Sequence, residues 1–185
     1  MNYTESVDFA LNVLRGGGVI LYPTDTIWGL GCDATCSDAV NKIIRLKGRS
    51  DNQSFIVLVH EVKLIEHYIE QVPEIAYSLI EVSDTPLTII YPGAHPSGLA
   101  PQVIAPDGSV AIRVVQHPFC SSILQKFRKP IVSTSANLPA NRLPPAFPPS
   151  TSTCTSWLTT AWTQPLKRPP QENHLPSSSS NSTAK

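Results

Sequence analysis

The sequence has no excess of charge of either sign, no long apolar run and no paired cysteine motif. Fourteen basic residues balance fourteen acidic ones over 185 residues, so the net charge points to no charged partner. No segment is long and apolar enough to cross a membrane, and the first residues lack the features of a signal peptide. The four cysteines do not have the spacing of a metal site. We therefore expect a cytoplasmic protein with unlinked thiols and one core of ordinary size.

Glycine is missing from the last part of the chain. From Leu138 onward the sequence holds half of its 18 prolines, no glycine and a single acidic residue, Glu172. A segment rich in proline, serine and threonine is typical of a disordered tail. The sequence therefore predicts a folded domain over residues 1–138 and a tail over residues 139–185.

Up to about residue 137, helical and strand patterns alternate, which favours an α/β domain. Hydrophobic spacing predicts helices over Val7–Leu14, from an N-cap at Ser37, over Val62–Ile69, over Ile75–Val82 and over Pro118–Phe127. Short apolar runs predict strands over Val19–Leu21, Phe55–Val59, Leu87–Tyr91, Val110–Val114 and Ile131–Ser133.

The segment YPTDTIWGLG, from Tyr22 to Gly31, places hydroxyl and carboxylate groups directly after an apolar strand. Pro23 ends this strand because it has no N–H to donate to a sheet. The two glycines near the end of the segment let a backbone approach a ligand closely. Taken alone, the segment fits a hairpin or a strand-to-helix loop better than a ligand site.

Three further polar groups follow strands or helix ends. Lys47 and Arg49 flank a glycine after a predicted helix, Arg113 lies within the apolar strand SVAIRV, and Ser133 to Asn137 read STSAN. A charge inside an apolar strand must meet an anionic partner or reach solvent. Two basic side chains beside hydroxyl groups suit a triphosphate, and an arginine suits a carboxylate. Each group alone is more often a surface charge or a turn.

The order of the motifs PTDTxxGLG, KGR, SxAIRV and STSAN resembles the YrdC-like family of L-threonylcarbamoyladenylate synthases over about residues 9–138. The resemblance implies an α/β fold in which an open, twisted, mixed sheet and its helices surround a deep basic cavity. It also implies an enzyme that joins L-threonine, bicarbonate and ATP, with Mg²⁺ accompanying the ATP. The product, threonylcarbamoyl-AMP, would pass to a downstream threonylcarbamoyl transferase for modification of adenosine in tRNA. Family members are also described as binding double-stranded RNA.

The same resemblance implies roles for three residues in holding L-threonine. Thr26 and Ser133 would contact the amino acid, and Arg113 would bind its carboxylate through two parallel hydrogen bonds, for which lysine is a poor substitute.

The ATP side of the site is implied in the same way. Lys47 and Arg49 would clamp the phosphates and are the expected catalytic residues, while Ser109, Ser135 and Asn137 would line the nucleotide. The carbamate of threonine would attack the α-phosphorus directly, so no protein nucleophile is required. Catalysis would then depend on positioning and on stabilising charge on the phosphate oxygens.

Other functions remain open. A carbamoyl-transfer module of hydrogenase maturation would normally belong to a much longer chain with acylphosphatase-like and zinc-binding segments. A double-stranded RNA-binding module without catalysis would need a basic face, and the equal numbers of basic and acidic residues do not indicate one. The change of composition after Leu138 also allows an inactive, truncated remnant of the synthase.

The sequence after Leu138 departs from the family, which continues with Ser-Gly and ends in an STII-type motif. The resemblance therefore implies that the domain over residues 1–138 is incomplete at its C-terminal end. Combining the last base of each codon with the first two bases of the next allows Ser-Gly after Leu138 and apolar residues at helical spacing further on. One junction is fixed by the genetic code, since Trp162 followed by Thr163 can only give Asp. We hypothesise that the final 48 residues are out-of-frame text; resequencing this part of the gene tests the idea, and an uninterrupted frame with no family-like reading beside it would reject it.

Overall fold

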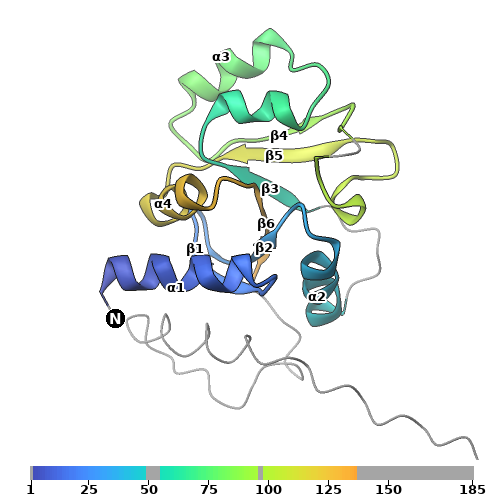
Figure 1. Cartoon of the computed structure of the whole chain (residues 1–185). Coiled ribbons are helices and arrows are strands. Elements are labelled where there is room, and N and C mark those ends of the chain that lie inside the picture. Colours follow the sequence, from blue (N-terminus) through green and yellow to red (C-terminus); the bar gives the residue numbers. More distant parts are fainter. Residues whose placement is uncertain (1, 49–54, 96–97, 137–185) are drawn as a thin grey trace, which may run out of the picture.

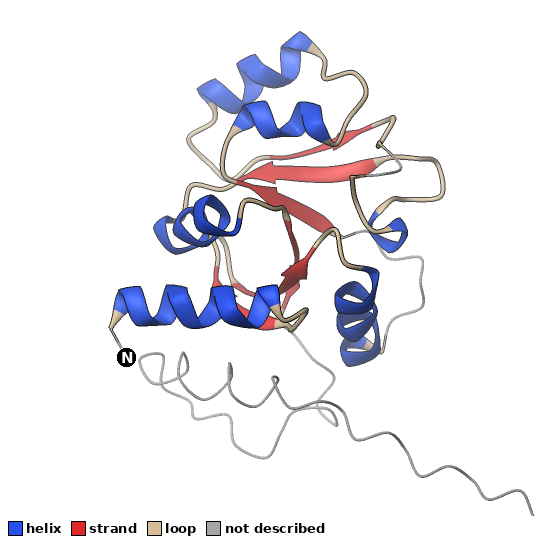
Figure 2. Cartoon of the chain, in the orientation of Figure 1, coloured by secondary structure: helices blue, strands red, loops and turns tan. Residues whose placement is uncertain are grey.

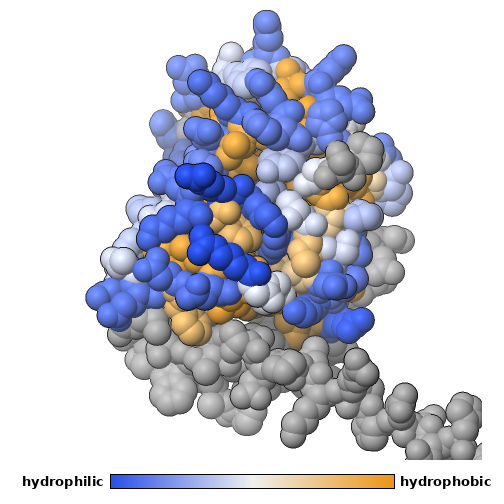
Figure 3. Space-filling view, viewed as in Figure 1, coloured by the Kyte–Doolittle hydropathy of each residue, from blue (hydrophilic) through white to orange (hydrophobic). Residues whose placement is uncertain are grey.

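The computed structural model describes residues 2–48, 55–95 and 98–136, so the tail, Arg49 and Asn137 lie outside the described residues. The elements are α1 (Tyr3–Arg15), β1 (Ile20–Pro23), β2 (Trp28–Asp33), α2 (Ser37–Lys47), β3 (Ile56–Val59), η1 (Val62–His67), α3 (Glu74–Val82), β4 (Thr88–Tyr91), η2 (Pro101–Val103), β5 (Val110–Val114), α4 (Pro118–Phe127) and β6 (Ile131–Ser135) (Figure 1). No helix among these residues is long and apolar enough to span a membrane. Hydrophilic side chains cover most of the face seen in Figure 3.

One six-stranded sheet forms the centre of the fold, in the order β1-β2-β6-β3-β5-β4 (Figure 2). β3 and β5 run parallel, and the other neighbouring pairs run antiparallel. The sheet is open, with β1 and β4 at its edges, and helices pack around it. The predicted open mixed α/β sheet is therefore confirmed.

The segment YPTDTIWGLG forms the β1–β2 hairpin, in which Pro23 pairs with Trp28. β2 was not expected as a strand, because two of its six residues are glycines and glycine weakens strand patterns. A larger residue would not fit at Gly31, because a Cβ atom there would lie 2.6 Å from Cε1 of the buried Tyr22. Close packing of the Tyr22 ring over the next strand therefore explains a strand that hydrophobic patterning missed.

The ends of α1 and α2 are capped in different ways. Asn2 and Glu5 form a capping box at the start of α1, each side chain bonding the backbone N–H of the other residue. α2 begins at Ser37, but its N-cap is Cys36, so the predicted cap at Ser37 is one residue too late. Gly48 ends α2 in the left-handed region, with φ 60°, which a glycine adopts without strain.

The segment expected as a helix over residues 62–69 is a 3₁₀-helix, η1, over Val62–His67. Its N-cap, Glu61, makes no side-chain capping bond, and only Ile65 among its residues is buried. With a single buried residue there is no apolar stripe to stabilise a longer α-helix. The other predicted helices and strands are present, with boundaries that shift by a few residues.

The two faces of the sheet pack against different elements. Val57 and Ile112 belong to one core, which also contains residues of α2 and η1. Leu58 and Ile131 point to the opposite face and pack with residues of α1 and α4 in a second core. Alternate residues of a strand share a face, so the central strands β3 and β6 contribute to both cores.

The helices α1 and α4 bury only part of this second face. Ser133 and Ser135 lie on the same face as Ile131, and Ile56 lies on the same face as Leu58, because these residues are two or four apart in their strands. Leu58 and Ile131 are buried, whereas Ile56 and the two serines are half-buried. The half-buried end of this face provides the floor of a pocket.

Candidate functional site

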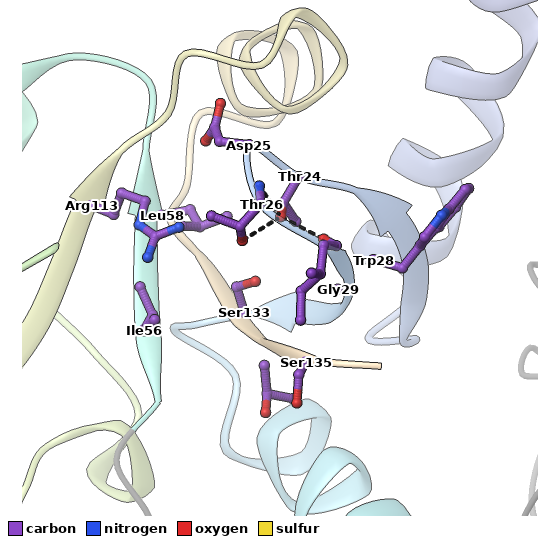
Figure 4. Close-up of a pocket in the computed structure, with 12 residues that line it drawn as sticks. Thr24, Asp25, Thr26, Trp28, Gly29, Ile56, Leu58, Arg113, Ser133 and Ser135 are labelled. Atoms are coloured by element: carbon purple, nitrogen blue, oxygen red, sulfur yellow. Dashed lines mark hydrogen bonds between the residues drawn. The ribbon is translucent and has the colours of Figure 1, made fainter. Parts of the chain in front are cut away.

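A pocket of about 150 Å³ lies at this uncovered end of the sheet (Figure 4). It is lined by residues 24–29 of the β1–β2 connection, Ile56 and Leu58 of β3, Arg113 of β5 and residues 133–135 of β6. This volume is below the roughly 300–1,000 Å³ of typical pockets for drug-sized ligands. The enclosed part therefore suits a small molecule, or one end of a larger ligand.

Thr24 shapes the wall of the pocket that contains Thr26. The Thr24 hydroxyl donates to the backbone carbonyl of Ile27 at 2.6 Å and accepts from the backbone N–H of Thr26 at 3.3 Å. Thr26 is exposed, and its own hydroxyl lies 3.4 Å from that of Thr24. The loop therefore holds Thr26 in place while leaving it accessible from the pocket.

Arg113 faces this loop from the opposite wall (Figure 4). The register places it beside Leu58 on one side and Thr88 on the other. Its Nε donates to the Thr88 hydroxyl at 2.7 Å, which orients the guanidinium. The guanidinium extends into the pocket, and a guanidinium held in this way can bind a carboxylate (Figure 4).

Two of the predicted serines and one predicted lysine meet at the β6 side of the pocket. Ser133 and Ser135 line it directly. The Nζ atom of Lys47 donates to the backbone carbonyl of Ser135 at 2.8 Å, and the lysine is only 7% exposed. The end of α2 therefore brings a basic side chain to the strand that carries the STSAN motif.

Ser109 is not among the residues that line the pocket. It immediately precedes β5, and its hydroxyl donates to Oδ1 of Asp107 at 2.7 Å. This bond, with a second one from the backbone N–H of Ser109, lowers the pKa of Asp107. The predicted contributions of Arg49 and Asn137 lie outside the described residues.

The apolar floor of the pocket, made by Ile56 and Leu58, was not predicted from the sequence. Both belong to the strand FIVLV, whose uninterrupted apolar run indicates burial on both faces but not which residues face a ligand. Only the pairing of Ile56 with Ser133, and of Leu58 with Arg113, assigns them to the site.

The three described cysteines, Cys32, Cys36 and Cys120, are free, as predicted. Cys120 of α4 lies behind the loop, where its thiol donates to the carbonyl of Pro23 at 3.1 Å. Burial, together with a smaller effect of the charge of Asp25, raises the pKa of Cys120 to about 12. The thiol is therefore a neutral structural group under ordinary conditions.

The raised pKa of Cys120 predicts that alkali destabilises the fold. Between about pH 9 and 12 the thiol ionises only in the unfolded chain, so its contribution to stability is complete below pH 9 and is lost as the pH rises. Each such group lowers the free energy of unfolding by about 1.4 kcal/mol per pH unit. We expect urea unfolding at pH 8 to 10.5 to give a shallower decline for Cys120→Ala than for the wild type. Equal slopes would contradict the assignment.

Comparison with known proteins agrees with this geometry. The family described as "Telomere recombination", Sua5/YciO/YrdC, matches residues 12–151. A threonylcarbamoyl-AMP synthase of Hahella chejuensis is 39% identical over 136 residues, which are 73% of this chain and 72% of the relative. The corresponding protein of Coxiella burnetii is 39% identical over 140 residues, 74% of this chain and 73% of the relative. The predicted enzyme family is therefore confirmed.

The fold is similar to a crystal structure of P. abyssi Sua5 complexed with L-threonine, with a TM-score of 0.69 and 25% sequence identity. The similarity covers 75% of this chain but only 40% of the P. abyssi chain. With matches in sequence over most of its length and in fold, the chain belongs to the Sua5/YciO/YrdC family of threonylcarbamoyl-AMP synthases.

Proposed function

We propose that this chain forms threonylcarbamoyl-AMP and pyrophosphate from L-threonine, bicarbonate and ATP, and that the described pocket binds the threonine. The proposal rests on the position of Arg113. Its guanidinium is oriented by Thr88 and faces Thr26 across a cavity of about 150 Å³. An oriented guanidinium suits a carboxylate, and a hydroxyl beside it suits a small polar amino acid. The crystal structure of P. abyssi Sua5, which is complexed with L-threonine, supports the same ligand.

The sheet register supports a separate position for the nucleotide. Ile56 pairs with Ser133 on one side and with Ala111 on the other. Ser135 follows Ser133 in an antiparallel strand, and Ser109 precedes Ala111 in a parallel one, so both serines lie in the same direction from Ile56.

Arg113 lies in the other direction, in the row of Leu58. The end of the sheet near Ser135, Lys47 and Ser109 is therefore distinct from the end near Arg113, which we call the threonine side. We place the ATP there, with Lys47 on its phosphates, and we expect Arg49 and Asn137 to complete this part of the site.

The chemistry follows from this arrangement. The threonine amine adds to carbon dioxide derived from bicarbonate and gives a carbamate. An oxygen of the carbamate then attacks the α-phosphorus of ATP in line, the bond to the bridging oxygen of the β-phosphate breaks, and pyrophosphate leaves. The chain would act by holding the two substrates in this geometry and by placing positive charge near the phosphate oxygens.

Mg²⁺ would enter with the ATP and neutralise charge on the phosphates. The described residues contain no group of three or more His, Cys, Asp or Glu side chains that could hold a metal, so the ATP phosphates would supply its main ligands. We further propose that the product serves tRNA modification through a downstream transferase. A cytoplasmic location is supported by the three free cysteines.

The proposal is tested by pyrophosphate release from the full chain. We expect release when ATP, L-threonine and bicarbonate are all present, and a fall to background when any one of them is omitted. L-Alanine, which lacks the hydroxyl, should be a much poorer substrate. Release that does not depend on threonine would contradict the proposal, because simple ATP hydrolysis requires no amino acid.

A further inference from the structure

We propose that Asp25 is a positioning residue, which fixes Thr26 opposite Arg113 by tying the β1–β2 loop to the end of β5. The inference rests on the proposed function, because it concerns the threonine side of that site. Asp25 is half-buried and lies between the two threonines of the loop. Its Oδ1 accepts a hydrogen bond from the backbone N–H of Gln116 at 3.1 Å. This bond joins residues 91 positions apart in the chain.

The bond from Asp25 to Gln116 requires the β1–β2 loop to turn back over the sheet, toward the end where Arg113 lies. Gly29 pairs with Ser135, so a loop that continued straight from β2 would leave the sheet at the Ser135 end. Arg113 lies at the other end, in the row of Ile131 and Leu58. Gln116 lies still further along in this second direction. The loop must therefore turn back over the sheet, and Asp25 holds its turned position.

The other hydrogen bonds of the loop serve a different purpose. The bonds of Thr24 to Ile27 and Thr26 stay within the loop, so they fix its shape but not its distance from β5. The Cys120 thiol holds the carbonyl of Pro23 at 3.1 Å, which anchors the start of the loop to α4. Asp25 supplies the bond from the middle of the loop to the segment that follows Arg113.

The geometry favours this role over that of a general base for the threonine amine. The Asp25 carboxylate points away from the Thr26 side chain (Figure 4). One of its oxygens is already bonded to a backbone N–H. A backbone partner requires an acceptor atom and not a negative charge, so asparagine should replace Asp25 in this role.

The test is titration of the full chain with L-threonine by calorimetry. We expect Asp25→Ala to weaken threonine binding by about 10-fold, because the untethered loop must be ordered by the ligand. Asp25→Asn should stay within about 3-fold of the wild type, since its side-chain oxygen accepts the same N–H. ATP affinity should not change in either variant. Asp8→Ala, which removes an exposed carboxylate paired with Lys126, is the matched control and should bind threonine like the wild type.

A double-mutant cycle separates positioning from general damage. If Asp25 acts through Thr26, Asp25→Ala should weaken threonine binding by less than 2-fold when added to Thr26→Val. Asp25→Leu, which keeps the size of the side chain without an acceptor, should repeat the result of Asp25→Ala if the alanine variant folds poorly. Equal losses with Asp25→Asn and Asp25→Ala, or equal losses of threonine and ATP binding, would overturn the inference. A wild-type chain that binds threonine without turnover would reject the proposed function alone, and one that does not bind threonine would reject both.

Discussion

Replacing Arg113 by alanine should weaken L-threonine binding by about 100-fold or more. The guanidinium is the one basic group among the described residues that line the pocket, and Thr88 orients it. Removing one partner of a buried, hydrogen-bonded charge pair typically costs about 2–5 kcal/mol. Calorimetry with the full chain measures the loss, and ATP affinity should fall far less because Arg113 lies on the threonine side.

Two further variants sharpen this prediction. Arg113→Lys keeps the charge but not the planar fork, so it should recover only a small part of the lost affinity. Arg15→Ala, which removes an exposed arginine at the end of α1, should bind threonine like the wild type. If Arg113→Lys bound threonine as tightly as the wild type, a bidentate contact with the carboxylate would be excluded.

Gly31→Ala should be the most damaging small substitution in the hairpin. The added Cβ would lie 2.6 Å from Cε1 of Tyr22 and 2.9 Å from the backbone carbonyl oxygen of Val132. The backbone atom cannot move without disturbing the pairing of β2 with β6, which also carries Ser133. Overpacking of this kind usually costs about 1–3 kcal/mol, and we expect a value near the upper end, about 3 kcal/mol.

Urea unfolding followed by circular dichroism measures this loss of stability. The matched control is Gly16→Ala at the end of α1, where a Cβ would meet its nearest atoms at 3.4 and 3.5 Å and φ is −79°. Its unfolding midpoint should stay close to that of the wild type. Similar midpoints for Gly31→Ala and Gly16→Ala would show that the close packing of Tyr22 over β2 is not required.

Arg113 was predictable from the sequence because a charged residue in an apolar strand is unusual and must be accounted for. Thr26 and Ser133 belong to polar runs that directly follow or end apolar strands, which also marks them locally. Lys47 follows from the amphipathic pattern of α2, which places it in the last turn of the helix. These local signals mark the residues as candidates only, and it is the order of their motifs along the chain that assigns them to one site.

The relations between segments were not predictable. The apolar floor of Ile56 and Leu58 depends on strand register, and register depends on which strands become neighbours. The bond from Asp25 to Gln116 joins two loops far apart in the chain, so neither loop indicates it. The hydrogen bond from the Ser109 hydroxyl to Asp107 likewise depends on the conformation of the turn before β5.

Detection of the covalent product would show directly that the chain makes threonylcarbamoyl-AMP. Incubating the full chain with ATP, L-threonine and ¹³C-bicarbonate should give a nucleotide with the mass of AMP carrying a threonylcarbamoyl group. Because that group contains one carbon from bicarbonate, the mass should exceed that of the product from ordinary bicarbonate by the difference between ¹³C and ¹²C. Mass spectrometry of the reaction mixture reads this out, and the nucleotide should disappear without threonine. Conversion of ATP to AMP or ADP with no labelled, threonine-containing nucleotide would contradict the proposed synthase activity.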